Sequence, residues 1–130
     1  MSQVSYVNVV GNLMYVMISI RPDISHVVGI VSMFMENPRE EHWWAVKSVL
    51  RYLRGTNDHC IIFSGSEGSV CGYVDVDYAG DLDKRRSTIG YVFTFAGGEI
   101  SWMSKLQEIV ALCTTKANCI ATSDACKEAI

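Results

Sequence analysis

Two acidic residues in an alternating β pattern are the part of this sequence best suited to chemistry. In a strand, successive side chains point to opposite faces, so Val74 and Val76 are expected to face a core while Asp75 and Asp77 share the other side. Two such carboxylates repel unless a cation, a hydrogen-bond donor or water lies between them, which favours a hard-metal site with oxygen ligands. The alternative is a solvated strand end that runs into an acidic turn, because Asp and Gly are common turn residues.

Four strands are expected to position this acidic segment. After residues 55–58 the apolar period changes from helical to alternating. The predicted strands are Cys60–Ser64, Val70–Asp77, Thr88–Phe95 and Glu99–Met103. Gly97 and Gly98 are expected to supply the positive φ angles of a tight hairpin turn. Asp81–Ser87 is a mixed-charge connector, which is typical of a solvated loop.

The first part of the chain predicts three helices. Pro22 with Asp23 marks the start of the second helix, and the third is expected to begin with Asn37 as its cap and Pro38 in the first position. Gly55 is expected to end it. The predicted apolar faces comprise Val7, Val10, Leu13, Met14, Met17 and Ile18, then Ile24, Val27, Val28, Val31, Phe34 and Met35, then Trp43, Val46, Val49, Leu50 and Leu53.

A last helix is predicted from Thr114 onward, with Thr114 or Thr115 as its cap. Small residues at Ala117, Ala121 and Ala125 would let this helix lie flat on a sheet. Lys116 falls in the first turn, where a positive charge meets the positive end of the helix dipole. The helical pattern is still running at the last residue, so we expect a shortened domain.

Composition favours one ordinary domain or two incomplete pieces of larger ones. The chain has 130 residues, 49% of them hydrophobic, and a net charge of -3, which argues against a generic electrostatic nucleic-acid binder. Its five cysteines include no C-x-x-C pair. This pattern favours reduced, partly buried thiols in an intracellular protein of the cytoplasm or nucleus.

The apolar opening of the chain is not expected to enter a membrane. Residues 6–20 are interrupted by Asn8, Gly11 and Asn12, and they are fewer than the ~20 residues that a spanning helix needs. No basic run precedes them, as a signal peptide would require. The segment is therefore predicted to be a buried helix of a soluble protein.

A set of short motifs covers nearly the whole chain in a characteristic order. Their residues are Tyr6–Tyr15, Arg21–Ile24, His42-Trp43, Leu50–Thr56, Gly72–Asp75, Asp77–Asp81, Arg86–Thr88, Gly90–Phe93 and Ser101-Trp102. In this order and spacing they resemble the end of the Pol polyprotein of copia-type retrotransposons, which are abundant in plant genomes. Residues 1–57 are similar to the tail of the reverse transcriptase, and residues 58–130 resemble the start of a ribonuclease H domain.

The resemblance implies an α/β (α+β) fold, with N-terminal helices followed by a truncated ribonuclease H-like mixed sheet and a helix packed on it. Such enzymes hydrolyse the RNA strand of an RNA–DNA hybrid with two magnesium ions held by acidic residues. The hybrid is recognised chiefly through its backbone shape and 2′-hydroxyls. Asp75 matches the family's first catalytic carboxylate and metal ligand, and no catalytic role is carried over to Asp77.

The sequence departs from the family pattern at its second catalytic carboxylate. Where the family reads Ser-Thr-Thr-Glu-Ala-Glu-Tyr, this chain has Cys113-Thr-Thr-Lys-Ala-Asn-Cys119, so Asn118 stands at the catalytic glutamate. A neutral amide at this position and the cation of Lys116 both weaken binding of magnesium, which prefers anionic oxygen ligands. We therefore expect that magnesium is not held tightly and that the chain is an inactive relative of the enzyme.

Two alternatives stay open at this point. One is a non-catalytic module that binds a partner protein, for which an acidic chain with exposed apolar surface is suited. The other is residual binding of an RNA–DNA hybrid through Lys84, Arg85 and Arg86, which would weaken steeply with added salt. Self-association through an open sheet edge is also expected, because unpaired backbone groups along an edge invite pairing.

Overall fold

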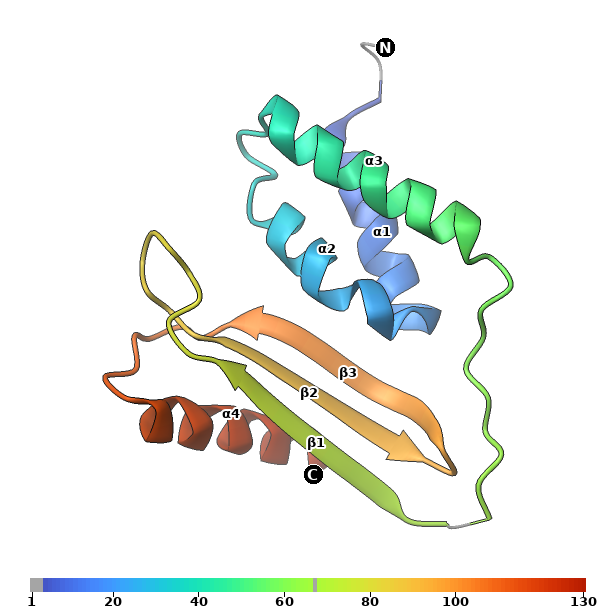
Figure 1. Ribbon diagram of the computed structural model, residues 1–130, viewed down its shortest axis with the longest axis vertical. Coiled ribbons are helices and arrows are strands. Elements are labelled where there is room, and N and C mark those ends of the chain that lie inside the picture. Colours follow the sequence, from blue (N-terminus) through green and yellow to red (C-terminus); the bar gives the residue numbers. More distant parts are fainter. Residues whose placement is uncertain (1–3, 67) are drawn as a thin grey trace. The chain divides into compact units, whose positions relative to one another are not determined.

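A computed structural model describes residues 4–66 and 68–130 of the chain. It divides into two compact units, residues 1–61 and residues 62–130. The described residues contain four α-helices, one short 3₁₀ helix and three strands (Figure 1). The expected class of mixed α and β structure is confirmed, and the described strands pair only in antiparallel fashion.

The first unit is a small helical bundle. It contains α1 (Tyr6–Ile20), η1 (Pro22–Ile24), α2 (Ser25–Ser32) and α3 (Glu40–Gly55). The predicted start at Pro22 is confirmed, because the proline takes the first position of η1, where its missing N–H costs no hydrogen bond. The expected cap at Asn37 is wrong. The cap of α3 is Arg39, whose backbone N–H donates to His42 Nδ1 at 2.9 Å.

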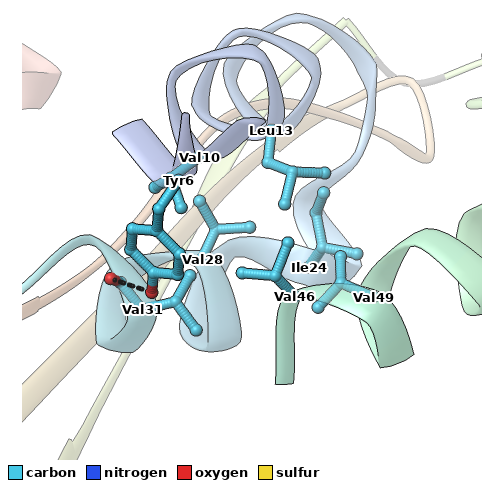
Figure 2. Packing of buried hydrophobic residues seen from close by; sticks show 8 residues of the cluster. All are labelled: Tyr6, Val10, Leu13, Ile24, Val28, Val31, Val46 and Val49. Carbon is cyan, nitrogen blue, oxygen red and sulfur yellow. Dashed lines mark hydrogen bonds between the residues drawn. The ribbon is translucent and has the colours of Figure 1, made fainter. Parts of the chain in front are cut away.

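Eight buried side chains from α1, η1, α2 and α3 form the core of this unit, as Figure 2 shows. They are Tyr6, Val10, Leu13, Ile24, Val28, Val31, Val46 and Val49. The buried Tyr6 hydroxyl donates to the backbone oxygen of Val31 at 2.8 Å, so the core carries no unpaired phenol. Two residues assigned to the apolar face of α1 lie outside this core, because Val7 and Ile18 are exposed.

The second unit is a three-stranded sheet in the order β1-β2-β3, formed by β1 (Val70–Asp77), β2 (Thr88–Phe95) and β3 (Gly98–Leu106). The predicted bounds of β1 and β2 are confirmed. The predicted strand Cys60–Ser64 is wrong: these residues have no regular structure, because no described strand pairs with them. The segment is followed by Gly65, whose backbone N–H donates a hydrogen bond of 2.7 Å to Ala96 O. The two backbones lie so close here that a side chain at position 65 would collide with Ala96.

The hairpin between β2 and β3 turns one residue earlier than predicted. Positive φ angles occur at Ala96 (51°) and Gly97 (80°), and Gly98 already belongs to β3. Two positive φ angles in succession match the twist of the flanking strands. A bulge between Phe93 and Thr94 then shifts the pairing near the turn.

Helix α4 (Thr114–Ala129) lies along one face of the sheet (Figure 1). The predicted alanine face of the helix is confirmed, since Ala117, Ala121 and Ala125 are buried. The helix is capped by Cys113 rather than by Thr114 or Thr115, and no side chain of the cap binds the first turn. Small side chains on this face let the helix approach the sheet closely.

The cysteines do not occupy the partly buried positions that composition suggested. Cys60, Cys71, Cys113, Cys119 and Cys126 are all exposed and all free. Cys71 lies on the outer strand β1. Cys113 directly precedes α4, and Cys119 and Cys126 lie on the exposed side of that helix. Among the described residues, no helix has the length and apolar content needed to cross a membrane.

Candidate functional site

The two carboxylates of β1 share one face of the sheet, as the alternation predicted. Residues opposite each other in antiparallel strands point to the same side, and Asp75 lies opposite Gly90 while Val74 lies opposite Tyr91. Helix α4 covers the side of Tyr91, because on β3 the same side carries Lys105, which pairs with Asp124 of α4 at 3.1 Å. By this alternation Asp75 points to the face that α4 does not cover.

β1 gives these carboxylates little protection from water. Seven of its eight residues are exposed and Val76 is half-buried, so the expected core position of Val74 is wrong. The cause is topological, because β1 has a neighbour on only one side in the described sheet. A carboxylate in this setting is well solvated, and water screens its charge.

Each carboxylate is already engaged close to its own backbone. Asp75 Oδ1 accepts a hydrogen bond of 2.8 Å from the N–H of Val76. The carboxylate of Asp77 folds over the following turn and contacts Gly80 so closely that a side chain there would collide with it. The carboxylate of Asp77 therefore lies against the turn that follows β1.

Asn118 and Lys116 lie in the first turns of α4, on either side of the buried Ala117. Both side chains are exposed, and the backbone oxygen of Asn118 accepts a bond of 2.9 Å from the hydroxyl of Thr122. Because Asp75 points away from the face that carries α4, the structure does not bring Asp75 and Asn118 together around a common point.

The described residues do not fit a magnesium site. No group of three or more His, Cys, Asp or Glu side chains among them is arranged to hold a metal ion. The family pattern would offer Asp75 as one anionic ligand, while Asn118 adds only a neutral oxygen and Lys116 a repelling cation. No step through a metal ion is derived for this arrangement.

The mixed-charge loop after β1, Asp81–Ser87, is closed by hydrogen bonds between its own residues. Asp81 accepts a backbone hydrogen bond from Arg85 (2.8 Å) and donates one to the carbonyl of Arg86 (3.1 Å). Arg86 Nε also lies 3.7 Å from a carboxylate oxygen of Asp81, and both side chains are partly buried. Of the three predicted contact residues, Lys84 and Arg85 are thus exposed, whereas Arg86 belongs to the loop's own structure.

Two buried polar residues connect this loop to α4, and sequence reasoning assigned neither a role. Ser87 is fully buried, and its hydroxyl accepts the N–H of Ala79 at 3.1 Å. Gln107 donates its backbone N–H to Ser87 O at 2.8 Å and its side-chain Nε2 to Ala117 O at 2.9 Å. These bonds fix the first turn of α4 against the ends of β2 and β3. In the sequence, the only sign of these hydrogen bonds is a polar residue at the end of a strand.

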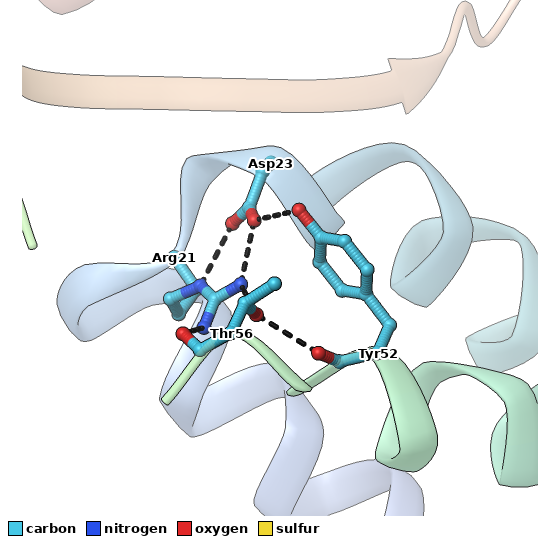
Figure 3. A network of polar contacts seen from close by, with 4 residues as sticks. All are labelled: Arg21, Asp23, Tyr52 and Thr56. Carbon is cyan, nitrogen blue, oxygen red and sulfur yellow. Dashed lines mark hydrogen bonds and ion pairs between the residues drawn. The ribbon is translucent and has the colours of Figure 1, made fainter. Parts of the chain in front are cut away.

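A second polar arrangement lies in the helical unit and joins two of the sequence motifs (Figure 3). Arg21 binds the carboxylate of Asp23 through Nε (3.0 Å) and Nη2 (2.7 Å). It also donates to the hydroxyl (2.7 Å) and the carbonyl (3.1 Å) of Thr56. Tyr52 completes the set with a hydroxyl bond of 2.6 Å to Asp23. We call these four residues the Arg21 network.

The Arg21 network changes the acidity of its members. The pKa of Asp23 is lowered to about 2, mainly by its hydrogen bonds from Arg21 and also by the one from the Tyr52 hydroxyl. Partial burial of the carboxylate acts in the opposite direction. The hydrogen bond to Asp23 raises the pKa of the Tyr52 phenol. The network therefore holds a charged pair at the junction of η1 with the end of α3. It is a structural tie rather than a reactive centre, because its charges satisfy each other.

The sequence is similar to Pol polyproteins from plant transposons. The chain is 57% identical over all 130 residues to the retrovirus-related Pol polyprotein from transposon TNT 1-94 of Nicotiana tabacum, and covers 10% of that protein. It is 43% identical over 113 residues, 86% of the chain, to the corresponding polyprotein from transposon RE2 of Arabidopsis thaliana, covering 8% of it. No protein-family model matches the chain, and no solved structure does.

One relative is of comparable length. The chain is 44% identical over 131 aligned residues to the secreted RxLR effector protein 161 of Plasmopara viticola, and covers 92% of that protein as well as the whole of this chain. By contrast, it spans about a tenth of the tobacco polyprotein. Four relatives from transposons are between 35% and 57% identical to the chain over 86% to 100% of its length. The chain therefore belongs to the family of retrovirus-related Pol polyproteins from transposons and the proteins related to them.

Proposed function

We propose that this chain carries a degenerate ribonuclease H-like unit of a copia-type Pol polyprotein, preceded by helices of its reverse-transcriptase tail, and that it does not hydrolyse RNA–DNA hybrids. One observation carries the proposal: Asn118, at the family's catalytic glutamate, is an exposed amide beside the cation of Lys116. A two-ion mechanism needs several anionic ligands converging on one point. The single matching carboxylate, Asp75, lies on the other face of the sheet.

The test is cleavage of a labelled RNA–DNA hybrid by purified, folded protein in magnesium and then in manganese. We expect no cleavage above that of an Asp75→Asn variant, which removes the one matching carboxylate. A parallel reaction with an active ribonuclease H establishes that the hybrid is cleavable. Cleavage by the unaltered chain that the Asp75→Asn substitution abolishes would contradict the proposal, because a working site would then exist.

A non-catalytic binding role is the second candidate. A relative that the chain covers almost completely bears the name of a secreted effector rather than of a polyprotein. In addition, Lys84 and Arg85 project from the loop after β1, whereas Arg86 is held by Asp81. If hybrid is bound through this loop, only about two phosphates are neutralised, so log K should fall with log salt at a slope of roughly -2.

Titration of hybrid binding against salt separates this candidate from the first. Lys84→Ala with Arg85→Ala should remove the salt-dependent part of the affinity, whereas Lys127→Ala, at the far end of α4, serves as a charge-matched control. Salt-independent binding, or equal loss in the control, would exclude the loop as the contact. The expected location in the cytoplasm or nucleus stays a prediction, to be checked by imaging a tagged chain.

A further inference from the structure

Helix α1 carries apolar residues on two sides. Its fifteen residues include no charged side chain. One side supplies Tyr6, Val10 and Leu13 to the core of the first unit, where Figure 2 shows them turned toward α2 and α3. A helix that buries a single stripe normally has charged or polar residues elsewhere, whereas an apolar helix is normally covered on all sides. The exposed side of α1 carries the polar residues Asn8, Asn12 and Ser19, but it also carries large apolar side chains that nothing in the helical unit covers.

Four residues define the outer stripe of α1: Val7, Gly11, Tyr15 and Ile18. Three of them expose large apolar side chains, Val7 at 46%, Tyr15 at 75% and Ile18 at 68%. Their spacing of four, four and three residues places them along one line of the helix surface, away from the buried stripe. Val4, just before the helix, extends the line and is 64% exposed.

Gly11 marks a flat point at the middle of the outer stripe. A side chain added there would meet no atom within 4 Å, so nothing inside the protomer requires a glycine at this place. Glycine also destabilises a helix interior relative to alanine. What it permits is the close approach of another backbone, as at the crossing point of two tightly packed helices.

The stripe is symmetric about this glycine. Val7 and Tyr15 lie four residues to either side of Gly11, and Val4 and Ile18 lie seven residues to either side. Two such helices, packed antiparallel around a two-fold axis at Gly11, would bring Val7 against the second copy's Tyr15 and Val4 against its Ile18. We propose that the outer stripe of α1 is an interface between two copies of this chain.

A second copy fits this surface better than a different partner does. A two-fold interface requires a patch that is complementary to itself, and the spacing about Gly11 meets that requirement. The stripe has no charge with which to attract an acidic or basic partner. Its side chains expose roughly 500 Å² per chain, so a symmetric pair would bury on the order of 1,000 Å², at the low end for a specific interface. The expected dimer is therefore weak and reversible.

The test is sedimentation of the full chain from about 1 μM to about 100 μM, the range in which an interface of this size should dissociate. We expect the average mass to rise toward that of a dimer. Gly11→Glu should weaken association on the order of tenfold or more, because it places like charges at the crossing point. Asn12→Glu adds the same charge at the next exposed position, outside the stripe, and should leave association unchanged. Circular dichroism verifies that each variant is folded.

Cross-linking then tests the geometry. In a background with the five exposed cysteines replaced by serine, Gly11→Cys should form a disulfide between copies on oxidation. Tyr15→Cys should not, because in an antiparallel pair two such positions lie about 12 Å apart along the axis. Disulfides at both positions would indicate a parallel pair, in which each position faces its own counterpart, and would overturn the proposed arrangement.

Two further outcomes would overturn the interface itself. One is a chain that stays monomeric over the whole concentration range. The other is association that Gly11→Glu leaves intact but that Val74→Pro in β1 abolishes, since proline removes a donor from a strand edge. That result would assign self-association to the exposed edge of the sheet instead.

Discussion

Arg21 and Asp23 flank a proline at the start of η1, and their side chains meet through two hydrogen bonds of 3.0 and 2.7 Å. The guanidinium is 8% exposed, whereas the carboxylate keeps 35% of its surface. The remaining guanidinium donors reach Thr56, so this pair ties the beginning of η1 to the end of α3, 35 residues later in the chain. Two motifs that look independent in the sequence are thus one structural unit.

Removal of the carboxylate should destabilise the helical unit. In Asp23→Asn the buried guanidinium of Arg21 loses its countercharge, and we expect a loss of about 1–3 kcal/mol in the free energy of unfolding, moderated because Asp23 is partly solvated. Urea unfolding followed by circular dichroism measures the change. Asp58→Asn, which removes the same charge from an exposed residue, should cost less than about 0.5 kcal/mol. Equal losses of stability in the two variants would show that the Arg21–Asp23 pair does not stabilise the helical unit.

The same pair predicts an acid-dependent stability. The pKa of Asp23 is about 2 in the folded chain, below its ordinary value, so the ionised carboxylate stabilises the fold at pH values above about 4. That contribution should be lost progressively as the pH falls from about 4 to about 2. Unfolding measured across this window checks it. In Asp23→Asn this part of the pH dependence should disappear, and a profile unchanged by the substitution would contradict the assignment.

Core leucine and surface leucine should respond differently to truncation. Leu13 is 3% exposed within the core of the first unit, and Leu13→Ala should cost about 2–4 kcal/mol through lost burial and the cavity left behind. Leu82 is 85% exposed in the loop after β1, and Leu82→Ala should change stability by less than about 0.5 kcal/mol. Thermal unfolding of both variants provides the comparison. A small effect at Leu13 would mean that this core is loosely packed.

Reversal of the charge at the first and at the last turn of α4 should have opposite effects on stability. Lys116 lies in the first turn, which contains no acidic residue, so Lys116→Glu should stabilise the helix by about 0.5–1 kcal/mol through the helix dipole. Lys127 lies in the last turn and pairs with Asp124 at 3.1 Å, so Lys127→Glu should be destabilising. Thermal unfolding measures both. Stabilisation by both substitutions would indicate a general charge effect instead.

Local patterns determined much of the fold. The helical period predicted the segments that became α1, α2 and α3, and the alternating period predicted β1 and β2 at their observed bounds. The alanine spacing identified the buried side of α4. These features follow from short-range geometry, because side-chain periodicity alone states which residues share one side of a helix or strand. Through the resemblance to the family, the sequence likewise singled out Asp75 and Asn118 as the positions on which activity is expected to depend.

Long-range contacts decided the rest. The segment Cys60–Ser64 has the composition of a strand, yet it forms none, since a strand exists only where a neighbour accepts its hydrogen bonds. The apolar residues Val7 and Ile18 of α1 stay exposed because the core contacts only the other side of the helix. The Arg21 network and the bonds of Gln107 join residues far apart in sequence, which no local pattern encodes. The tertiary structure alone showed that Asp75 and Asn118 do not converge, because convergence depends on which face of the sheet α4 covers.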